Sequence, residues 1–442
     1  MEERYIAAIE ISSSKVIGAI GKTDGHGRLD VVAVHRESGI EAVRHGVIQN
    51  LEETSMRIST TLHRLQEHSS VRPRKVSGVF VGLSGRSMRS IKVRTSVSLP
   101  EDSEITEDVL DRLRRQALNS DIDSSLEIID AVPRSYKIGK LETLSPKGVI
   151  GNEISAIFDL IVCRPELTRN LTRTVNEKLN LRIEGMIVTA LATGALIPTR
   201  EEKRLGCMLV DMGAETTTVS IYKNGSLRYL ATLPLGGRNI TRDLTTLNML
   251  EERAEDIKIT SAVALPRPTP PTAMKGGVPL TEIDNYVQAR AGEIVANIME
   301  QIEYAGLKSG DLPGGIIVIG GASRLNKMEQ LLHDESSLKV RRGKLPEYVE
   351  VTDAKAHQTE LMEVVSILYA GATHSNAVCL EMPVEQGLPS NGEAPEDSED
   401  EYEDEPSRRK VRKQRNTEKV AWWKDKLTNW FKPGEDDSDT LD

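Results

Sequence analysis

The sequence predicts an α/β protein built from two copies of one domain. It also predicts a small β/α subdomain inserted in the first copy and a disordered, charged C-terminal linker that ends in an amphipathic helix. Three observations carry this prediction. Short apolar strands alternate with amphipathic helices over residues 5–380. One strand–turn–strand element occurs twice. Beyond Met382 charged residues dominate, and all three tryptophans lie in the last 21 residues, outside the predicted core.

Length and composition exclude several classes of protein. At about 150 residues per domain, 442 residues suggest roughly three units. The balance of 57 basic and 67 acidic residues gives a net charge of −10, which argues against a nucleic-acid binder. Three widely spaced cysteines cannot form a disulfide framework or a CxxC zinc site. The sequence has no secretory signal and no apolar run of the roughly 18 residues that a membrane span requires, so we expect a cytosolic protein.

The first half reads as a β-meander followed by helix and strand. Strands are predicted at 5–11, 16–22, 29–35 and 76–83, with helices at 51–68 and 166–179. Between them the pattern changes, and the insertion is predicted to contain strands at 90–97, 126–138 and 153–162 with a charged helix at 107–119.

The second half restarts the same scheme. Strands are predicted at 207–212, 217–222, 226–230 and 314–321, with helices at 238–247, 280–307 and 362–371. Five prolines in residues 266–279 exclude a helix or central strand there.

The two halves match at one turn. In register, Glu10 corresponds to Asp211 and Ser12 to Gly213, and each carboxylate ends a buried strand before a tight turn of small residues. Consecutive backbone N–H groups in such a turn can hold phosphate oxygens, and a carboxylate before it can hold Mg²⁺ through water. An ordinary hairpin is the alternative for either turn alone. The expected phosphate-binding residues are Ser12, Ser13, Ser14, Lys15, Gly213, Ala214, Glu215, Thr216 and Thr217.

A third element follows the apolar run at 316–319. It consists of Gly320, Gly321, Ala322 and Ser323. Glycines permit a close approach of the backbone, which suits a flat adenosine lying on the loop. Taken alone this pattern is common in α/β proteins, so its meaning depends on the two turns.

The order of these three elements resembles the actin-like ATPase superfamily, which has a duplicated, ribonuclease H-like fold. Within it the chain resembles the FtsA family of bacterial cell-division proteins. Residues 12–16 are similar to that family's G-[TS]-S-K-V turn, 235–244 to its V-G-G-x-x-I-T-x-D-[IL] segment, and 254–258 to its A-E-x-[LI]-K helix. The resemblance implies that Gly236, Gly237, Glu255 and Lys258 lie beside the adenosine.

The resemblance also implies a division of the chain. The first lobe would comprise 1–83 and 164–203, interrupted by the family's inserted subdomain at 84–163. The second lobe would comprise 204–236 and 311–382, with a partner-binding subdomain at 237–310. A disordered linker would follow at 383–418 and a membrane-targeting helix at 419–432.

Three departures from the family pattern bear on hydrolysis. Glu10-Ile11-Ser12 replaces Asp-x-Gly, and Glu215 adds a negative charge where phosphates are expected. Chaperone relatives carry a glutamate that orients the attacking water, but the matching position here is Thr189. Threonine cannot act as a base at neutral pH. We therefore expect weakened or conditional binding of ATP with Mg²⁺, with little or no hydrolysis and no catalytic residue.

The tail pattern is typical of a helix lying in a membrane interface. Its apolar side chains fall within an arc of about 100°, flanked by lysines. The expected membrane-binding residues are Val420, Trp423, Lys424, Leu427, Trp430 and Phe431. The linker before it has nine acidic residues among 393–405 and six basic residues among 408–415. Basic residues favour an anionic leaflet. The alternative is a helix that docks into the core or a partner groove.

The resemblance implies a peripheral protein on the cytoplasmic face of the inner membrane at the division septum. Its partners would be the C-terminal peptide of the tubulin-like FtsZ, other division proteins, further copies of itself in filaments, and the anionic membrane. Three alternatives remain open: a PilM-like scaffold for pilus assembly, a small-molecule kinase of the same superfamily, and a chaperone-like ATPase. The kinase and the PilM-like scaffold do not need the tryptophan-rich tail, and a chaperone-like ATPase would need a substrate-binding domain that the chain lacks.

Overall fold

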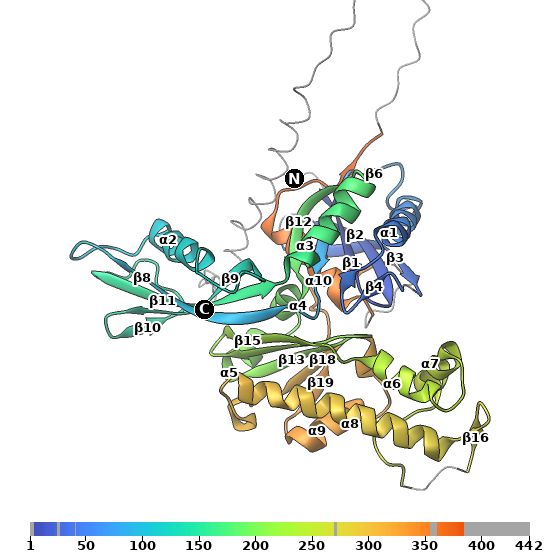
Figure 1. The fold of residues 1–442 in the computed structure, drawn as a ribbon. Helices are drawn as coiled ribbons and strands as arrows, with labels where there is room; N and C mark the ends of the chain where they lie inside the picture. Colours follow the sequence, from blue (N-terminus) through green and yellow to red (C-terminus); the bar gives the residue numbers. More distant parts are fainter. Residues whose placement is uncertain (1–3, 24–26, 40, 269–271, 354–359, 384–442) are drawn as a thin grey trace, which may run out of the picture.

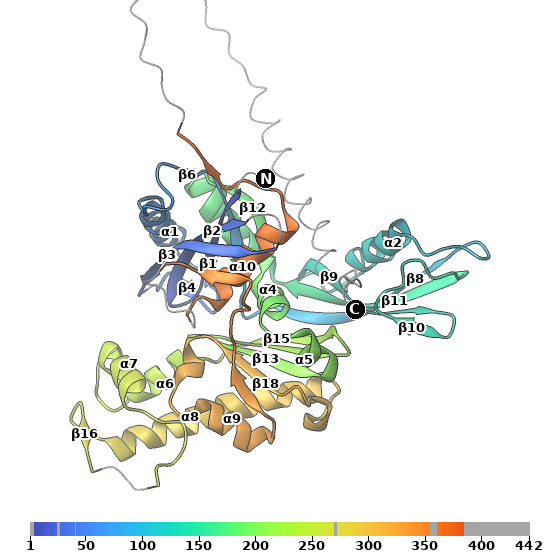
Figure 2. The same ribbon diagram turned by 180° about the vertical axis from the view of Figure 1, so that it is seen from behind.

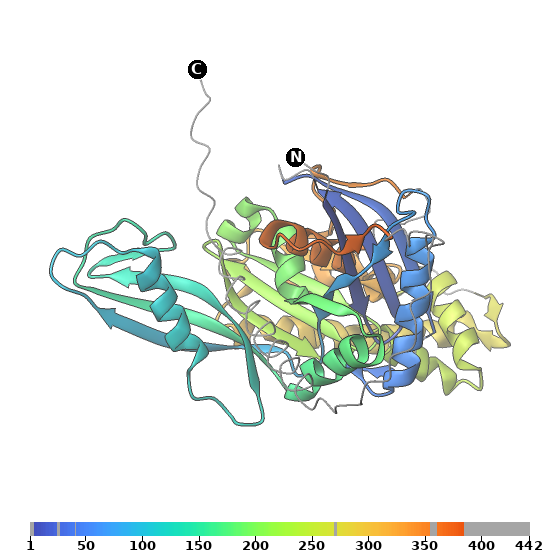
Figure 3. The same ribbon diagram turned by 90° about the horizontal axis from the view of Figure 1, so that it is seen from above.

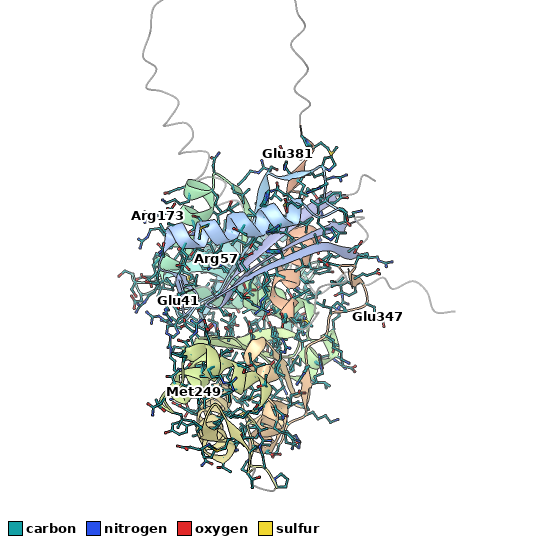
Figure 4. All side chains as sticks on the ribbon, turned by 90° about the vertical axis from the view of Figure 1, so that its right-hand side faces the viewer. Glu41, Arg57, Arg173, Met249, Glu347 and Glu381 are labelled. Atoms are coloured by element: carbon teal, nitrogen blue, oxygen red, sulfur yellow. The ribbon has the colours of Figure 1, made fainter. Side chains whose placement is uncertain are left out.

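A computed structural model describes residues 4–23, 27–39, 41–268, 272–353 and 360–383. Two lobes are stacked one above the other, and a narrow subdomain projects sideways from their junction (Figure 1). Seen from the side, Arg57 lies on a helix of the upper lobe and Met249 in the lower lobe (Figure 4). None of the helices in these ranges is long and apolar enough to cross a membrane.

The first lobe is formed around a six-stranded sheet with the order β12-β7-β1-β2-β3-β20. β1, β2 and β3 are antiparallel, whereas β7 pairs with β1 and β12 with β7 in parallel. The strands are β1 Arg4–Ile11, β2 Lys15–Thr23, β3 Leu29–Ser38, β7 Gly78–Leu83, β12 Arg182–Val188 and β20 Val349–Val351. β1 and β7 are buried almost throughout because helices cover both faces of the sheet (Figure 3). These helices include α1 Leu51–Gln66, α4 Thr189–Leu196 and α10 Met362–His374.

The second lobe repeats this topology. Its strands follow the order β15-β14-β13-β18-β19, with three antiparallel strands and then two parallel ones, as in β3-β2-β1-β7-β12 of the first lobe. The strands are β13 Cys207–Met212, β14 Thr217–Lys223, β15 Ser226–Leu233, β18 Ile316–Ile319 and β19 Val340–Arg342. The predicted duplicated α/β fold is therefore confirmed.

The inserted subdomain has its own apolar core and extends the second sheet. β8 pairs with β15 at a single position, Arg89 with Ala231, so nine strands form one continuous sheet. Helix α2 packs on one face of its strands. The elements are β8 Arg89–Ser98, α2 Glu107–Leu118, β9 Glu127–Ile138, β10 Leu141–Thr143 and β11 Glu153–Cys163.

Four helices complete the second lobe. The longest, α8, runs beneath the sheet and buries an apolar face that includes Ile283, Val287 and Ile294 (Figure 2). α6 and α7 pack beside its N-terminal half. The helices are α6 Gly237–Thr245, α7 Glu251–Thr260, α8 Leu280–Tyr304 and α9 Met328–Ser336.

Most predicted elements shift by up to three residues at their ends, and two differ further from the prediction. The elements that have not yet been named are short. The helix predicted at 166–179 is α3 Pro165–Thr172 followed by a π-helical turn, Arg173–Lys178. The strand predicted at 314–321 is only β18, because Gly315 and Gly320 take positive φ angles at its two ends. The shorter elements are β4 Val43–Arg44, β5 Val47–Ile48, β6 Lys75–Val76, α5 Arg200–Leu205, β16 Met274–Lys275, β17 Val278–Pro279 and β21 Leu380–Glu381. The predicted helix at 419–432 and residues 384–418 of the linker lie outside the described residues.

Candidate functional site

The first candidate phosphate turn connects β1 to β2. Glu10 is buried at the end of β1 and pairs with Ile17 across the hairpin. The N–H of Ser12 donates to the carbonyl of Lys15 at 3.0 Å, which closes the turn. Ser13 and Ser14 occupy the tip between them, so their backbone N–H groups are not used in the ladder of the two strands.

The second candidate phosphate turn has the same geometry. Asp211 pairs with Thr218, in the register that Glu10 and Ile17 have in the first turn. The N–H of Gly213 donates to the carbonyl of Thr216 at 2.8 Å, the equivalent of the Ser12–Lys15 hydrogen bond. Ala214 and Glu215 occupy the tip, and Thr217 begins β14. The predicted correspondence between the turns thus extends to individual hydrogen bonds.

Three carboxyl groups and one lysine meet where the two turns face each other. They belong to Glu10, Asp211, Glu363 of α10 and Lys15. Burial raises the pKa of Glu10 to about 7, although Lys15, 3.9 Å from its Oε2, opposes the shift. Burial and the neighbouring carboxyl groups of Glu363 and Glu10 also raise the pKa of Asp211. Burial lowers the pKa of Lys15, but the attraction of Glu10 and Glu363 outweighs it and the net shift is upward.

Two buried carboxyl oxygens of this group and one buried hydroxyl of α4 have no hydrogen-bond partner. They are Oε2 of Glu10, Oε2 of Glu363 and Oγ1 of Thr189 at the start of α4. Buried oxygen atoms normally have a hydrogen-bond partner, so these atoms require water or a ligand to satisfy them. Mg²⁺ binds carboxylates while it keeps several of its waters, and these residues therefore fit a hydrated magnesium ion. We find no set of metal-ligating side chains close enough to bind an ion directly among the described residues.

The predicted adenosine residues lie together beside the second turn. Lys258 Nζ donates to the carbonyl of Gly237 at 3.1 Å and to Glu255 Oε2 at 2.6 Å, which joins α7 to the start of α6. Burial lowers the pKa of Lys258 although Glu255 opposes the shift. Gly236 lies so close to the second turn that an added Cβ would approach the carbonyl oxygen of Ala214 to 2.6 Å.

The loop after β18 completes this side. Gly320 has a φ of 83° and packs against the second turn, because an added Cβ would lie 2.5 Å from both Asp211 Oδ1 and the carbonyl oxygen of Met212. At Gly321 an added Cβ would meet no atom within 4 Å. Ala322 faces Gly237, and Ser323 is buried with its hydroxyl donating to the carbonyl of Gly320 at 2.7 Å.

Glu215 forms its ion pairs with arginines and not with Lys15 of the carboxyl group cluster. Its side chain is 1% exposed and bonds to Arg44, Arg238 and Arg242. Burial would raise the pKa of Glu215, but the His45 N–H and the guanidinium groups of Arg238 and Arg44 lower it to about 2. From the sequence, Glu215 is expected among the phosphates, and in the structure its carboxylate is surrounded by positively charged side chains.

The sequence indicated neither the arginines nor Glu363. Arg44 and His45 lie in the β4–β5 hairpin, far from both turns in the chain. Glu363 could have been noticed, because it lies near the start of the apolar helix α10, and a carboxylate in such a helix is rarely buried without a charged or polar partner. The predicted membrane-binding residues, Val420 to Phe431, lie outside the described residues.

The topology and the facing turns define an actin-like α/β protein with an inserted subdomain. A solved structure agrees: the PilM-PilN type IV pilus biogenesis complex matches with a TM-score of 0.59 and 14% identity, over 84% of this chain and 99% of that chain. At this identity the likeness concerns the fold alone.

Two family models match this chain. A model described as cell division protein FtsA matches residues 208–393, and one described as the SHS2 domain inserted in FtsA matches residues 85–162. The cell division protein FtsA of Porphyromonas gingivalis is 28% identical over 358 residues, which cover 77% of this chain and 73% of that protein. That of Pseudomonas aeruginosa is 26% identical over 354 residues, 77% of this chain and 83% of that protein. The chain belongs to the FtsA family of cell division proteins.

Proposed function

We propose that this protein binds MgATP between its two lobes and links the FtsZ ring to the cytoplasmic membrane during cell division. The observation that supports nucleotide binding best is the pair of equivalent turns, each preceded by a buried carboxyl group, with unsatisfied buried oxygens where they face each other. If the two turns were ordinary hairpins with no ligand, there would be no reason for buried oxygens between them to lack hydrogen-bond partners.

In this proposal each lobe contributes one turn to the phosphates. The phosphates contact backbone N–H groups at the two turn tips, those of Ser13 and Ser14 in one lobe and those of Ala214 and Glu215 in the other. Glu10 and Asp211 hold Mg²⁺ through its waters, and the ion neutralises phosphate charge. The adenosine lies between α6–α7, with Gly236, Gly237, Glu255 and Lys258, and the loop Gly320–Ser323.

We infer little hydrolysis. Thr189 occupies the position where chaperone relatives carry a carboxylate, and its hydroxyl cannot take a proton from water at neutral pH. Its Oγ1 is buried without a partner and can hold a water in place. ATP then acts as a ligand that stabilises one arrangement of the lobes. Phosphate release from ATP by the purified protein should stay near the background rate, and turnover at an ordinary enzymatic rate would refute this part.

The membrane link rests on the residue pattern at 419–432. We propose that the side chains of Val420, Trp423, Leu427, Trp430 and Phe431 enter the interface while Lys424 contacts anionic headgroups. The FtsZ tail peptide would bind the subdomain at 237–310. The inserted subdomain would contact a neighbouring copy in a filament and other division proteins.

Flotation with anionic lipid vesicles tests the link. The full-length protein should float, and a chain ending at Thr417 should not. A Trp423→Glu variant should also stay at the bottom of the gradient with an unchanged melting temperature, because it alters only the tail. If the full-length protein does not float, the helix serves a protein groove, and a pilus-type scaffold that reaches the membrane through a partner becomes the better proposal.

A further inference from the structure

The carboxylate of Glu215 joins three separate parts of the molecule. Oε2 accepts the backbone N–H of His45 at 2.8 Å. Oε1 accepts from Arg44 and Arg238 at 3.0 Å each and from Arg242 at 3.1 Å. Arg44 and His45 belong to the first lobe, Glu215 to the second phosphate turn, and the other two arginines to α6.

The hairpin that supplies Arg44 and His45 also contacts the first phosphate turn. The N–H of Gly46 donates to Ser13 Oγ at 3.1 Å. His45 and Gly46 have φ angles of 47° and 79°, as the two central residues of a type I′ turn do, so the hairpin tip is tightly constrained. One short segment, residues 44–46, therefore contacts both phosphate turns, and Glu215 is its attachment in the second lobe.

The charges within this group favour its persistence. Three guanidinium groups surround one carboxylate, and Arg238 also lies 3.9 Å from Glu251, which leaves one positive charge in excess. The exposed fraction of Arg44 is 44% and that of Arg242 is 47%, whereas Glu215 is buried. Its negative charge is compensated at the turn itself and does not add to the charge that approaching phosphates meet.

We propose that Glu215 is a positioning residue for the nucleotide: it fixes the second phosphate turn relative to the first through the hairpin tip at 44–46. The inference rests on the proposed function, because it takes the two turns as the phosphate site. It reverses the expectation from the sequence, in which the Glu215 carboxylate weakens binding by repelling phosphates.

The two views predict opposite results for Glu215→Gln. Glutamine keeps the size of the side chain and removes its charge. If the carboxylate repels phosphates, the variant binds ATP more tightly. If it positions the turn, the arginines lose their common negative charge and an NH2 group replaces one of the two carboxylate oxygens, so the Arg–Glu and His45 N–H bonds cannot all be kept. The variant then binds MgATP at least tenfold more weakly. Adenosine affinity should be unchanged, because the hydrogen bonds of the Glu215 carboxylate go to Arg44, His45, Arg238 and Arg242 and to none of the residues proposed to surround the adenosine.

Calorimetric titration of the full-length protein with MgATP and with adenosine separates these cases. Arg44→Gln is the second variant: its side chain is half exposed, and it should show the same selective loss. Because both changes break one link, the double variant should lose little more than either single variant. Asp130→Asn is the matched control, since it removes a buried carboxylate 2.8 Å from Arg114 within the inserted subdomain. It should leave both affinities unchanged.

Three results would overturn the inference. The first is equal or tighter MgATP binding by Glu215→Gln. The second is an equal loss of MgATP and adenosine affinity, which indicates general disruption of the lobe. The third is additive losses in the double variant. If the wild-type protein binds adenosine and MgATP equally weakly, the proposed phosphate site itself is wrong, and that failure is visible before any variant is made.

Discussion

Gly320 and Gly321 are neighbours with opposite environments, and replacing each with alanine tests the candidate adenosine loop. Gly320 has φ 83° and ψ 161°, a region of backbone space that is essentially restricted to glycine. Its Cβ would also lie 2.5 Å from the carbonyl oxygen of Met212. Backbone strain costs about 1–3 kcal/mol and the steric overlap about 1–3 kcal/mol more. Gly320→Ala should therefore lower the free energy of unfolding by roughly 2–6 kcal/mol.

Gly321→Ala is the matched comparison. Its Cβ would meet no atom within 4 Å, so the folded protein should lose little stability. In the proposed site that open space is where the adenosine lies, and the added methyl group should weaken ATP binding. Thermal unfolding followed by circular dichroism measures the first effect, and calorimetric ATP titration measures the second. Two results would contradict these predictions: a Gly320→Ala variant with the melting temperature of the wild type, or a Gly321→Ala variant with the ATP affinity of the wild type.

Three further predictions concern the same site. The pKa of Glu10 rises from 4.5 to about 7 on folding, so between these pH values the folded chain holds a proton that the unfolded chain has released. The melting temperature of the nucleotide-free protein should therefore fall as the pH rises from 4.5 to about 7. Glu10→Gln should make the melting temperature less dependent on pH in this range. Chelation of Mg²⁺ with EDTA should weaken ATP binding at least tenfold in the same titration but leave adenosine binding unchanged, and equal losses would contradict the placement of the ion. Lys258→Met should lower adenosine affinity and cost about 1.5–3 kcal/mol of stability by chemical denaturation, since it removes the hydrogen bonds that the charged Nζ donates from α7 to Gly237 and Thr241 of α6.

Local pattern was sufficient for the sheets and the paired turns. The alternation of apolar strands and tight turns is encoded within about ten residues, and a shared register of Glu10 with Asp211 is visible in the chain itself. β18 is shorter than the strand predicted at 314–321, because glycine conformations at Gly315 and Gly320 end it, and φ angles are not encoded by hydrophobicity.

Partnerships between distant residues were not predictable. The surroundings of Glu215 depend on Arg44, which lies 171 residues earlier, and on a hairpin tip whose position is set by tertiary packing. From the sequence alone, Glu215 is a carboxylate in a phosphate-binding turn, and it is expected to weaken binding because it repels the phosphates. Only the fold brings the guanidinium groups to it.

The chain connects the inserted subdomain to the first lobe, but its strands extend the sheet of the second lobe. Its two connecting segments join it to β7 and α3 of the first lobe, whereas β8 lies along β15 of the second lobe. There the N–H of Leu230 donates to Ser90 Oγ at 2.9 Å. The N–H of Thr232 donates to the carbonyl of Met88 at 3.1 Å. A rotation between the lobes must therefore turn the subdomain as well. β11 has 11 residues, a length of about 36 Å at roughly 3.3 Å per residue. A hinge rotation of about 5° would then displace the far end by about 3 Å. Small changes in lobe angle are thus amplified at a surface remote from the nucleotide, where another molecule could detect them.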